Sequence, residues 1–334
     1  MGIKGLSTFL KRVDINKNNV KSIKLSDISG KYVGVDASIF IYRFLYKPHC
    51  FVDSFITMIY SFLSNGIIPV YVFDGMPPCE KNGEIQCRKD KKDDYQKKID
   101  DMKIKLKNNE LDKDEIYEIK SEIGKLEKRV ITLNKDYVDL AQNILKCIGL
   151  SYVHLEYEAE YVASQLLKNG YIDYILSEDN DLFLYGCSAV LKDYSNINDT
   201  LTLYDFNGLL KNMNISYEQF VDMCLMVGVD YSGKLNRISL NKAYSLIKEF
   251  KSIENLYKFK IITIHPDPDG KIKNIIHQEL IEMKNDMEKY QFKKENTDLI
   301  GLYELFRKNR VIMTPKMKKI IMFFRNNNYN INII

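Results

Sequence analysis

Short runs of apolar, mostly β-branched residues recur along the chain, and polar or turn-forming residues follow each of them. This pattern is typical of buried strands. The predicted strands are YVGVDAS at 32–38, IIPVYVFDG at 67–75, SYVHL at 151–155, DYILSE at 173–178, AVLKDYS at 189–195 and TLTLYD at 200–205. Residues 5–13, 51–65 and 160–168 have helical spacing instead. Because helices and strands alternate, the sequence predicts an α/β fold with a central, mostly parallel sheet flanked by helices.

A long charged segment interrupts this alternation between Arg88 and Lys146. Its apolar residues recur every three or four positions in two stripes, one at 95–106 and one at 116–144, and a turn is expected at 107–109. Two amphipathic helices, folded as a hairpin that leaves the sheet and returns to it, fit this spacing. From Ser216 onward the pattern is helical, and the Asn-rich tail at 323–334 is expected to fray.

These patterns divide the chain into four regions that we expect to form one structural unit. They are an N-terminal α/β region at 1–88, the hairpin insertion at 89–146, an internal region at 147–255 and a helical C-terminal cap at 256–334.

Composition changes this picture little. The chain has 334 residues and a formal net charge of only +4, so a surface for nucleic acid would have to be a local patch. Its six cysteines form no CxxC pair, which favours a reducing compartment. No apolar run approaches the roughly 20 residues that span a bilayer. We therefore expect an intracellular protein without a membrane segment, and a monomer.

Seven carboxylates are expected at strand ends, almost all of them after apolar, β-branched runs, and the last is Asp230 in MVGVDYS. They are the most informative residues of the sequence. They are Asp36, Asp74, Glu158, Glu160, Asp179, Asp181 and Asp230. Strand ends of a parallel sheet meet at one edge, where α/β proteins bind ligands. Hard cations such as Mg²⁺ prefer oxygen ligands, and so many acids suggest two ions, as in two-metal phosphodiester hydrolysis. Mn²⁺ is expected to substitute for Mg²⁺.

Each feature also has a simpler interpretation. A single Asp that ends a strand is more often a turn or helix cap, and a cap role competes for one of Glu158 and Glu160. The charged hairpin, taken alone, is more typical of a solvated coiled coil. Against this, seven acids are too many to be caps. An extended chain at residues 179–181 would also put both aspartates on one face. Lys81 and Arg88 follow Asp74 closely, where they could meet a phosphate.

Several sequence blocks resemble one known family. MGIKGL, VDASIFIYRF, VFDGMPP, EYEAEYVASQLL, SEDNDLFLYG and CLMVGVDYS occur in the order and spacing of the flap endonucleases and their XPG-type relatives. The resemblance covers roughly residues 1–250. It implies a PIN-like 5′ nuclease fold with a helical arch and a helix–two-turn–helix segment. SEDNDLFLYGC and AVLKDYS are equally similar to the related 5′→3′ exonucleases of mismatch repair, so the subfamily stays open.

The resemblance also implies roles for individual residues. The seven acids match the ligands of two metal ions, and Lys81 and Arg88 match the basic pair at the scissile phosphate. Further DNA contacts are implied at Gly2, Tyr42, Lys125 and Arg129. Tyr42 would stack against a base, and core packing is its alternative role. The hairpin would be the arch that admits a single-stranded 5′ end.

The sequence departs from the family pattern in two places. Residues 236–243 lack the glycines of the helix–two-turn–helix, so Arg237 and Lys242 would have to bind phosphate through their side chains. Near the C-terminus, Met317 stands where a clamp-binding peptide has Gln, which leaves a sliding-clamp partner weakly supported against an ordinary packed helix end. The segment 265–271 is expected to be a surface loop without a metal.

The expected function is a structure-specific 5′ nuclease that hydrolyses DNA at a 5′ flap, nick or recessed end during replication, repair or recombination. We expect it at an intracellular site of DNA replication, nuclear or cytoplasmic, and a viral source is also open. Two alternatives are a catalytically silent scaffold that binds DNA junctions and an RNA 5′-exonuclease. A silent scaffold has no physical need for paired buried acids. The sequence offers no residue that reads a 2′-hydroxyl.

Overall fold

The computed structural model describes residues 3, 5–76, 81–107, 112–230, 238–278 and 295–326. Within these residues, seven strands form one sheet in the order β1-β7-β6-β5-β2-β3-β4. The strands are β1 Val20–Lys24, β2 Tyr32–Asp36, β3 Ile68–Phe73, β4 Tyr152–His154, β5 Tyr174–Leu176, β6 Ala189–Ser195 and β7 Thr200–Asp205. From β6 to β4 all neighbours are parallel, whereas β7 is antiparallel to both β6 and β1.

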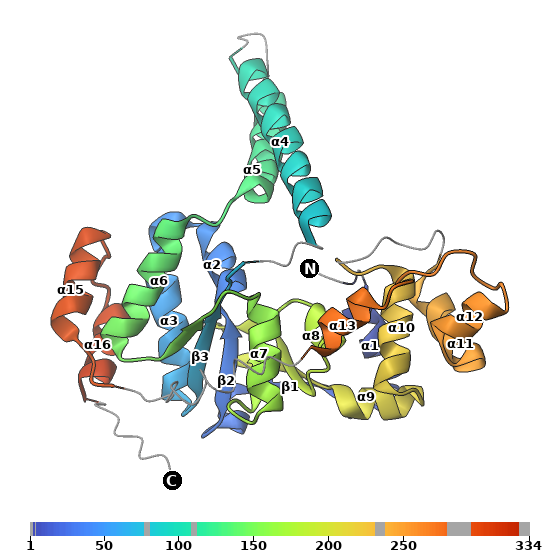
Figure 1. Ribbon diagram of the computed structural model, residues 1–334. Coiled ribbons are helices and arrows are strands. Elements are labelled where there is room, and N and C mark those ends of the chain that lie inside the picture. Colours follow the sequence, from blue (N-terminus) through green and yellow to red (C-terminus); the bar gives the residue numbers. More distant parts are fainter. Residues whose placement is uncertain are drawn as a thin grey trace.

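All six predicted strands are confirmed, and so is the mostly parallel sheet. Strand β1 was not predicted, because this edge strand exposes three of its five residues and its apolar positions are too sparse to form a pattern. Parallel pairing brings the ends of β2, β3, β4, β5 and β6 to the same edge of the sheet. This edge faces the base of the hairpin in Figure 1.

Helices cover both faces of the sheet (Figure 1). One face packs against α1 Leu6–Val13, α7 Ala159–Lys168, α8 Asp181–Leu184, α9 Phe206–Met213, α10 Tyr217–Val227, α11 Leu240–Phe250, α12 Ile253–Lys258 and α13 Lys271–His277. The other face packs against α2 Ala37–Leu45, α3 Phe51–Ser64, α6 Lys135–Ile148, α15 Leu299–Lys308 and α16 Pro315–Asn326, with the short turns η1 Leu25–Ile28 and η2 Pro48–Cys50 nearby. No helix of the described residues is both long and apolar enough to span a bilayer.

The predicted hairpin exists and consists of α4 Asn82–Lys105 and α5 Lys113–Val130. It stands away from the body in Figure 1 and has its own small core of Ile99, Ile123 and Leu126. The expected stripe at 116–144 is not one helix: the chain leaves helical geometry at Ile131, and Asn134 caps a new helix, α6. Because α6 packs against the body, the hairpin ends at Val130. Asn108 and Asn109 of the predicted turn lie outside the described residues.

Two C-terminal segments differ in how they join the body. Helix α16 buries Met317, Ile320 and Phe324 in the core, as an ordinary packed helix end does. The loop at 265–271 is present, but Asp267 points inward and accepts hydrogen bonds from the backbone N–H groups of Ile272 and Lys273 at 3.1 and 2.9 Å. Asp267 thus holds the start of α13. Residues 327–334, which include most of the tail expected to fray, lie outside the described residues.

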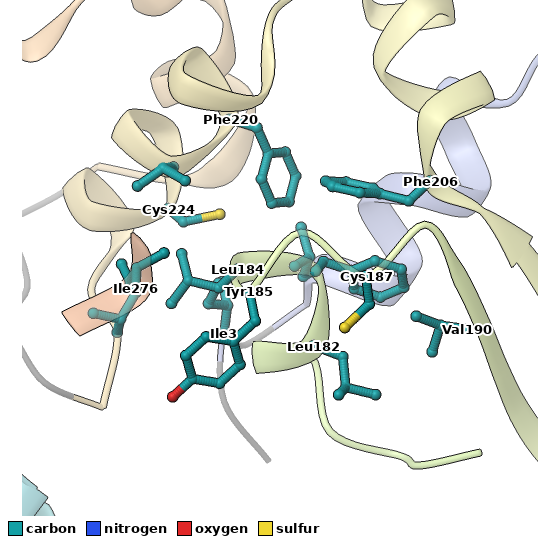
Figure 2. Packing of buried hydrophobic residues seen from close by; sticks show 14 of the residues in the cluster. Ile3, Leu182, Leu184, Tyr185, Cys187, Val190, Phe206, Phe220, Cys224 and Ile276 are labelled. Atoms are coloured by element: carbon teal, nitrogen blue, oxygen red, sulfur yellow. The ribbon is translucent and has the colours of Figure 1, made fainter. Parts of the chain in front are cut away.

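The core under α8 ties the N-terminus to distant elements. Figure 2 shows Ile3 beside Leu184 and Tyr185 of the α8 region and close to Cys224 of α10. Ile3 is fully buried there. Ile3 is therefore anchored beside the turn that leads from β5 into α8.

Candidate functional site

Asp36 and Asp74 come from neighbouring parallel strands. Asp36 ends β2 and caps α2, with its Oδ1 accepting the Ile39 N–H at 3.2 Å and its Oδ2 accepting the Ser177 hydroxyl at 2.9 Å. Asp74 follows β3, and its Oδ1 accepts the Ala159 N–H at 2.9 Å. Both acids therefore act as caps and still face the edge of the sheet, so the cap role and the site role are compatible.

Glu158 and Glu160 stand at the beginning of α7. Glu158 occupies the cap position but makes no capping hydrogen bond with its side chain, which leaves that carboxylate for other partners. The Gly75 N–H donates to the Tyr157 carbonyl at 2.8 Å, and a Cβ on Gly75 would collide with the Leu155 carbonyl. Gly75 is thus needed for the close approach of the loop after β3 to the segment before Glu158.

Asp179 lies in the turn between β5 and α8, and Asp181 is the first residue of α8. An extended chain was expected at residues 179–181, and this expectation is wrong, because Asn180 has helical backbone angles. The Asp179 carboxylate instead accepts the Asp181 N–H at 3.0 Å, the usual turn made by an aspartate side chain. Both residues are buried, and Asp181 Oδ1 has no hydrogen-bond partner in the described structure.

Asp230 does not end a strand. It follows α10 through Gly228 and Val229, so the strand expected from MVGVDYS is wrong. Helix α10 is buried along most of its length, and a helix buried all round has the same unbroken apolar sequence as a buried strand. The fold nevertheless brings Asp230 to the other acids, since Arg88 Nη2 donates to its Oδ2 at 2.9 Å.

Lys81 is the buried cation of this cluster, with 8% of its surface exposed. Its Nζ contacts Glu158 Oε1 at 2.7 Å and lies 3.9 Å from Asp230 Oδ2. Burial opposes the charge of Lys81, but Glu158 outweighs that effect and raises the pKa of Lys81 above its ordinary value. Lys81 and Arg88 both lie at the foot of α4 and so place two positive charges beside the acids.

The acids are close enough to disturb one another. Burial and the neighbouring Asp74 raise the pKa of Asp36 to about 8. Burial and Asp36 raise the pKa of Glu160, while burial and Asp179 raise that of Asp181. Carboxyl groups held together away from water favour the protonated form unless cations compensate them.

The donor set fits divalent metal ions by its chemistry. All seven predicted ligands offer oxygen, as Mg²⁺ prefers, and Asp181 Oδ1 is a buried acceptor without a partner. In the part of the chain that the structure describes, no three acidic, His or Cys side chains already form a metal centre. The carboxylates would have to reorient around an ion, and Lys81 now stands among them.

A cavity of about 1180 Å³ is lined by residues from the carboxyl edge of the sheet and from the base of the hairpin. Six of the seven acids line it, and Asp181 lies buried beneath. Tyr42 of α2 lines the cavity, so it is not a core residue, and Lys92 Nζ lies 5.9 Å from its ring centroid. Arg129 also lines the cavity and lies over the Tyr95 ring at 5.4 Å.

Other predicted DNA contacts lie elsewhere. Lys125 does not line the cavity: it is 67% exposed and pairs with Glu122 on α5. Four residues of helix rise about 6 Å, so Lys125 stands one turn farther from the body than Arg129. Lys242 is exposed on α11, away from the cavity lining. Gly2 and Arg237 lie outside the described residues.

Three basic residues of the cavity wall were not predicted: Arg43, Lys92 and Lys128. Their positions carried a signal. Lys92 follows Arg88 by four residues and shares its helix face, Arg43 adjoins Tyr42, and Lys128 adjoins Arg129. The cavity therefore has an acidic floor on the sheet and a basic wall on α2, α4 and α5.

Comparison with known proteins agrees with this architecture. Residues 1–95 match the XPG N-terminal domain and residues 149–230 match the XPG I-region. The chain is 31% identical to flap endonuclease 1 of Entamoeba dispar over 276 residues, which is 77% of this chain and 70% of the relative. It is 29% identical to flap endonuclease 1 of Enterocytozoon bieneusi over 272 residues, 77% of this chain and 72% of the relative.

Solved structures share the fold. The catalytic core of Rad2 in complex with a DNA substrate superposes with a TM-score of 0.67 at 22% identity, covering 97% of this chain and 99% of that one. Flap endonuclease-1 from Methanococcus jannaschii gives a TM-score of 0.65 at 21% identity, covering 94% and 98%.

The fold, the acidic edge under a helical hairpin and the two matched regions define an XPG-type nuclease. The chain belongs to the flap endonuclease family of structure-specific 5′ nucleases.

Proposed function

We propose that this nuclease hydrolyses DNA phosphodiesters at junctions of single and double strands near a 5′ end, with two Mg²⁺ ions. The observation that carries the proposal is the acidic floor of the cavity facing a basic wall. The acids suit divalent ions and the wall suits the phosphates of a nucleic acid. The relatives are flap endonucleases, and the Rad2 structure contains a DNA substrate.

The seven acids would hold the ions, which when bound would supply an activated water and stabilise the leaving oxygen. Lys81 and Arg88 would contact the scissile phosphate and stabilise its growing charge. Before substrate binds, their pairs with Glu158 and Asp230 keep both cations at the acids.

The wall above the acids would orient the strand. Tyr42 offers a π-face for a base next to the cleavage site, and Arg129 and Lys92 offer charge for the backbone. We propose that the hairpin α4–α5 selects a 5′ end by shape. Most direct protein–DNA contacts of such a site go to phosphates, which carry no base sequence. Action at an intracellular site of DNA replication, in nucleus or cytoplasm, follows from this substrate.

The test is cleavage of a 5′-labelled panel of flap, nicked, recessed and blunt DNA and a matched RNA, with Mg²⁺ and with EDTA. Asp181→Ala is assayed in parallel, because Oδ1 of this buried carboxylate has no hydrogen-bond partner within the described residues. We expect metal-dependent cutting at the flap base by the wild type, loss of cutting in the variant and near-normal DNA binding by both.

Other outcomes separate the alternatives. Release of single nucleotides from nicks and recessed ends would assign the exonuclease branch. Preference for the RNA would assign an RNA 5′-exonuclease. Junction binding without cutting under any metal would refute a nuclease and favour a scaffold.

A further inference from the structure

Strand β6 carries a bulge beside the cavity. Asp193 has a left-handed backbone with φ 55°, and the pairing of β6 with β7 shifts register between Lys192 and Ser195. In a regular strand residues 192 and 194 would share a face. Here Lys192 lies 5.7 Å from the Phe183 ring on one face, and Tyr194 packs against Phe62 at 5.3 Å on the other. Bulges of this kind re-aim side chains next to functional sites.

The bulge sends Lys192 under the turn that carries the two aspartates. Only 2% of Lys192 is exposed, and its ammonium donates to the carbonyls of Glu178 at 2.8 Å and Asp179 at 3.0 Å and to Asn180 Oδ1 at 3.0 Å. These three bonds use every donor of the ammonium group. The Glu178 side chain returns to the bulge and accepts the Asp193 N–H at 3.0 Å. Turn and bulge therefore hold each other in place.

Asn180 extends this network to the N-terminal segment. Its Oδ1 accepts the Ser7 hydroxyl at 2.7 Å, and its Nδ2 donates to the Ile3 carbonyl at 3.1 Å. Ile3 is itself anchored in the core (Figure 2). The middle residue of Asp179-Asn180-Asp181 thus faces away from the cavity and joins β6, the turn and the chain start.

We propose that Lys192 and Asn180 are positioning residues that hold the turn 178–181 in the shape its two aspartates need to bind divalent metal. The inference rests on the proposed function, because metal binding is what the turn's shape would serve. A buried ammonium costs desolvation free energy that a Met of similar length would avoid. The ammonium instead donates three hydrogen bonds, which fix two backbone carbonyls and one side-chain oxygen of this turn.

The experiment measures Mn²⁺ binding by the full-length protein without DNA, by electron paramagnetic resonance titration, for wild type, Lys192→Met and Asn180→Ala. Lys11→Met is the matched control: it removes a lysine that pairs with Asp193 at 3.2 Å but is 50% exposed and bonds nothing in the turn. Outer-sphere partners of metal ligands typically contribute 10- to 100-fold in metal affinity. We expect about 10-fold weaker Mn²⁺ binding in Lys192→Met and Asn180→Ala and no change in Lys11→Met.

Thermal unfolding of each variant shows that binding is measured on folded protein. If Lys192→Met does not fold, Asn180→Ala decides alone, since it removes a smaller side chain. Wild-type Mn²⁺ affinity in the folded variants, or an equal loss in Lys11→Met, would overturn the inference. A wild type that binds Mn²⁺ yet cuts no nucleic acid would overturn the proposed function and leave the inference standing. A wild type that binds no Mn²⁺ would overturn both.

Discussion

At the scale of single residues, the site is dominated by repulsion between buried acids. Asp36, Glu160 and Asp181 have raised pKa values because they are buried close to other acids. Lys81 offsets part of this repulsion from inside the cluster and Arg88 from its rim, where its side chain is 40% exposed. Removing an acid or a basic side chain of this cluster should therefore change both the free energy of unfolding and the cleavage rate.

Lys81→Met is expected to lower the single-turnover cleavage rate by about 100-fold or more, because it removes a preorganised charge at the phosphate. Lys125→Met is the matched control, since it removes an exposed lysine of the hairpin that does not line the cavity. Rates are measured at saturating enzyme on a labelled flap. Equal rates for Lys81→Met and the control would remove Lys81 from the reaction.

Stability of the metal-free protein is expected to depend on Asp36. Its pKa rises from an ordinary value of 3.8 to about 8 on folding, so the folded state binds the proton more tightly. The unfolded state then carries fewer protons between about pH 4 and about pH 8, and the free energy of unfolding falls as pH rises through that window.

Asp36→Asn keeps an acceptor for the Ile39 N–H but cannot ionise. The free energy of unfolding, measured with urea in EDTA, should therefore fall less for this variant than for the wild type as pH rises through the same window. Parallel curves for the two proteins would show that folding does not raise the pKa of Asp36.

At the scale of elements, the hairpin α4–α5 depends on its own small core. Ile99 is 1% exposed between the two helices, whereas Ile104, on the same helix α4, is 65% exposed. Nothing in the core of the body replaces the contacts of Ile99. The hairpin should therefore open without unfolding the rest of the molecule.

Ile99→Ala is expected to weaken the packing of the hairpin by about 2–5 kcal/mol, and Ile104→Ala to change it little. Hydrogen exchange followed by mass spectrometry should show faster exchange in α4 and α5 of Ile99→Ala, with β2 and β3 unchanged. Similar exchange in both variants would mean that the helices are held by contacts other than this core.

At the scale of the whole molecule, the C-terminal helices belong to the body. Phe324 of α16 is 1% exposed in the same cluster as β2 and β3, and Phe323 contacts Tyr60 of α3 at a ring distance of 5.0 Å. The residues around the weak clamp-binding motif are thus engaged in the fold. We expect one cooperative unfolding unit that includes residues 299–326.

Phe324→Ala should lower the free energy of unfolding by about 3–5 kcal/mol, because it opens a cavity in the shared core. Met322→Ala, at a position that is 61% exposed, is the control. Urea unfolding is followed by circular dichroism and by the cleavage activity that survives. Loss of α16 alone, with activity kept, would show that the C-terminal cap is a separate unit.

Much of the fold was predictable because its strands are buried on both faces and therefore apolar. Asp36 and Asp74 end such strands, and their place at the edge of the sheet was foreseen. Asp230 was misassigned to a strand, since a helix buried all round loses its periodic signal. The single stripe across 116–144 hid the break at Asn134, because α5 and α6 bury different faces against different partners.

The sequence by itself determined the strands, the hairpin, the set of acids and, through its motif blocks, the family. These features follow from the local hydrophobic pattern and from residue chemistry, both of which can be read from residues that are close together in the sequence. Only the tertiary structure decided that Lys192 reaches the turn 178–181, that Asn180 binds the N-terminal segment, and that Lys128 rather than Lys125 meets the cavity. Such contacts depend on the bulge in β6, on the break between α5 and α6 and on the length of α5. These features place residues that are distant in sequence side by side.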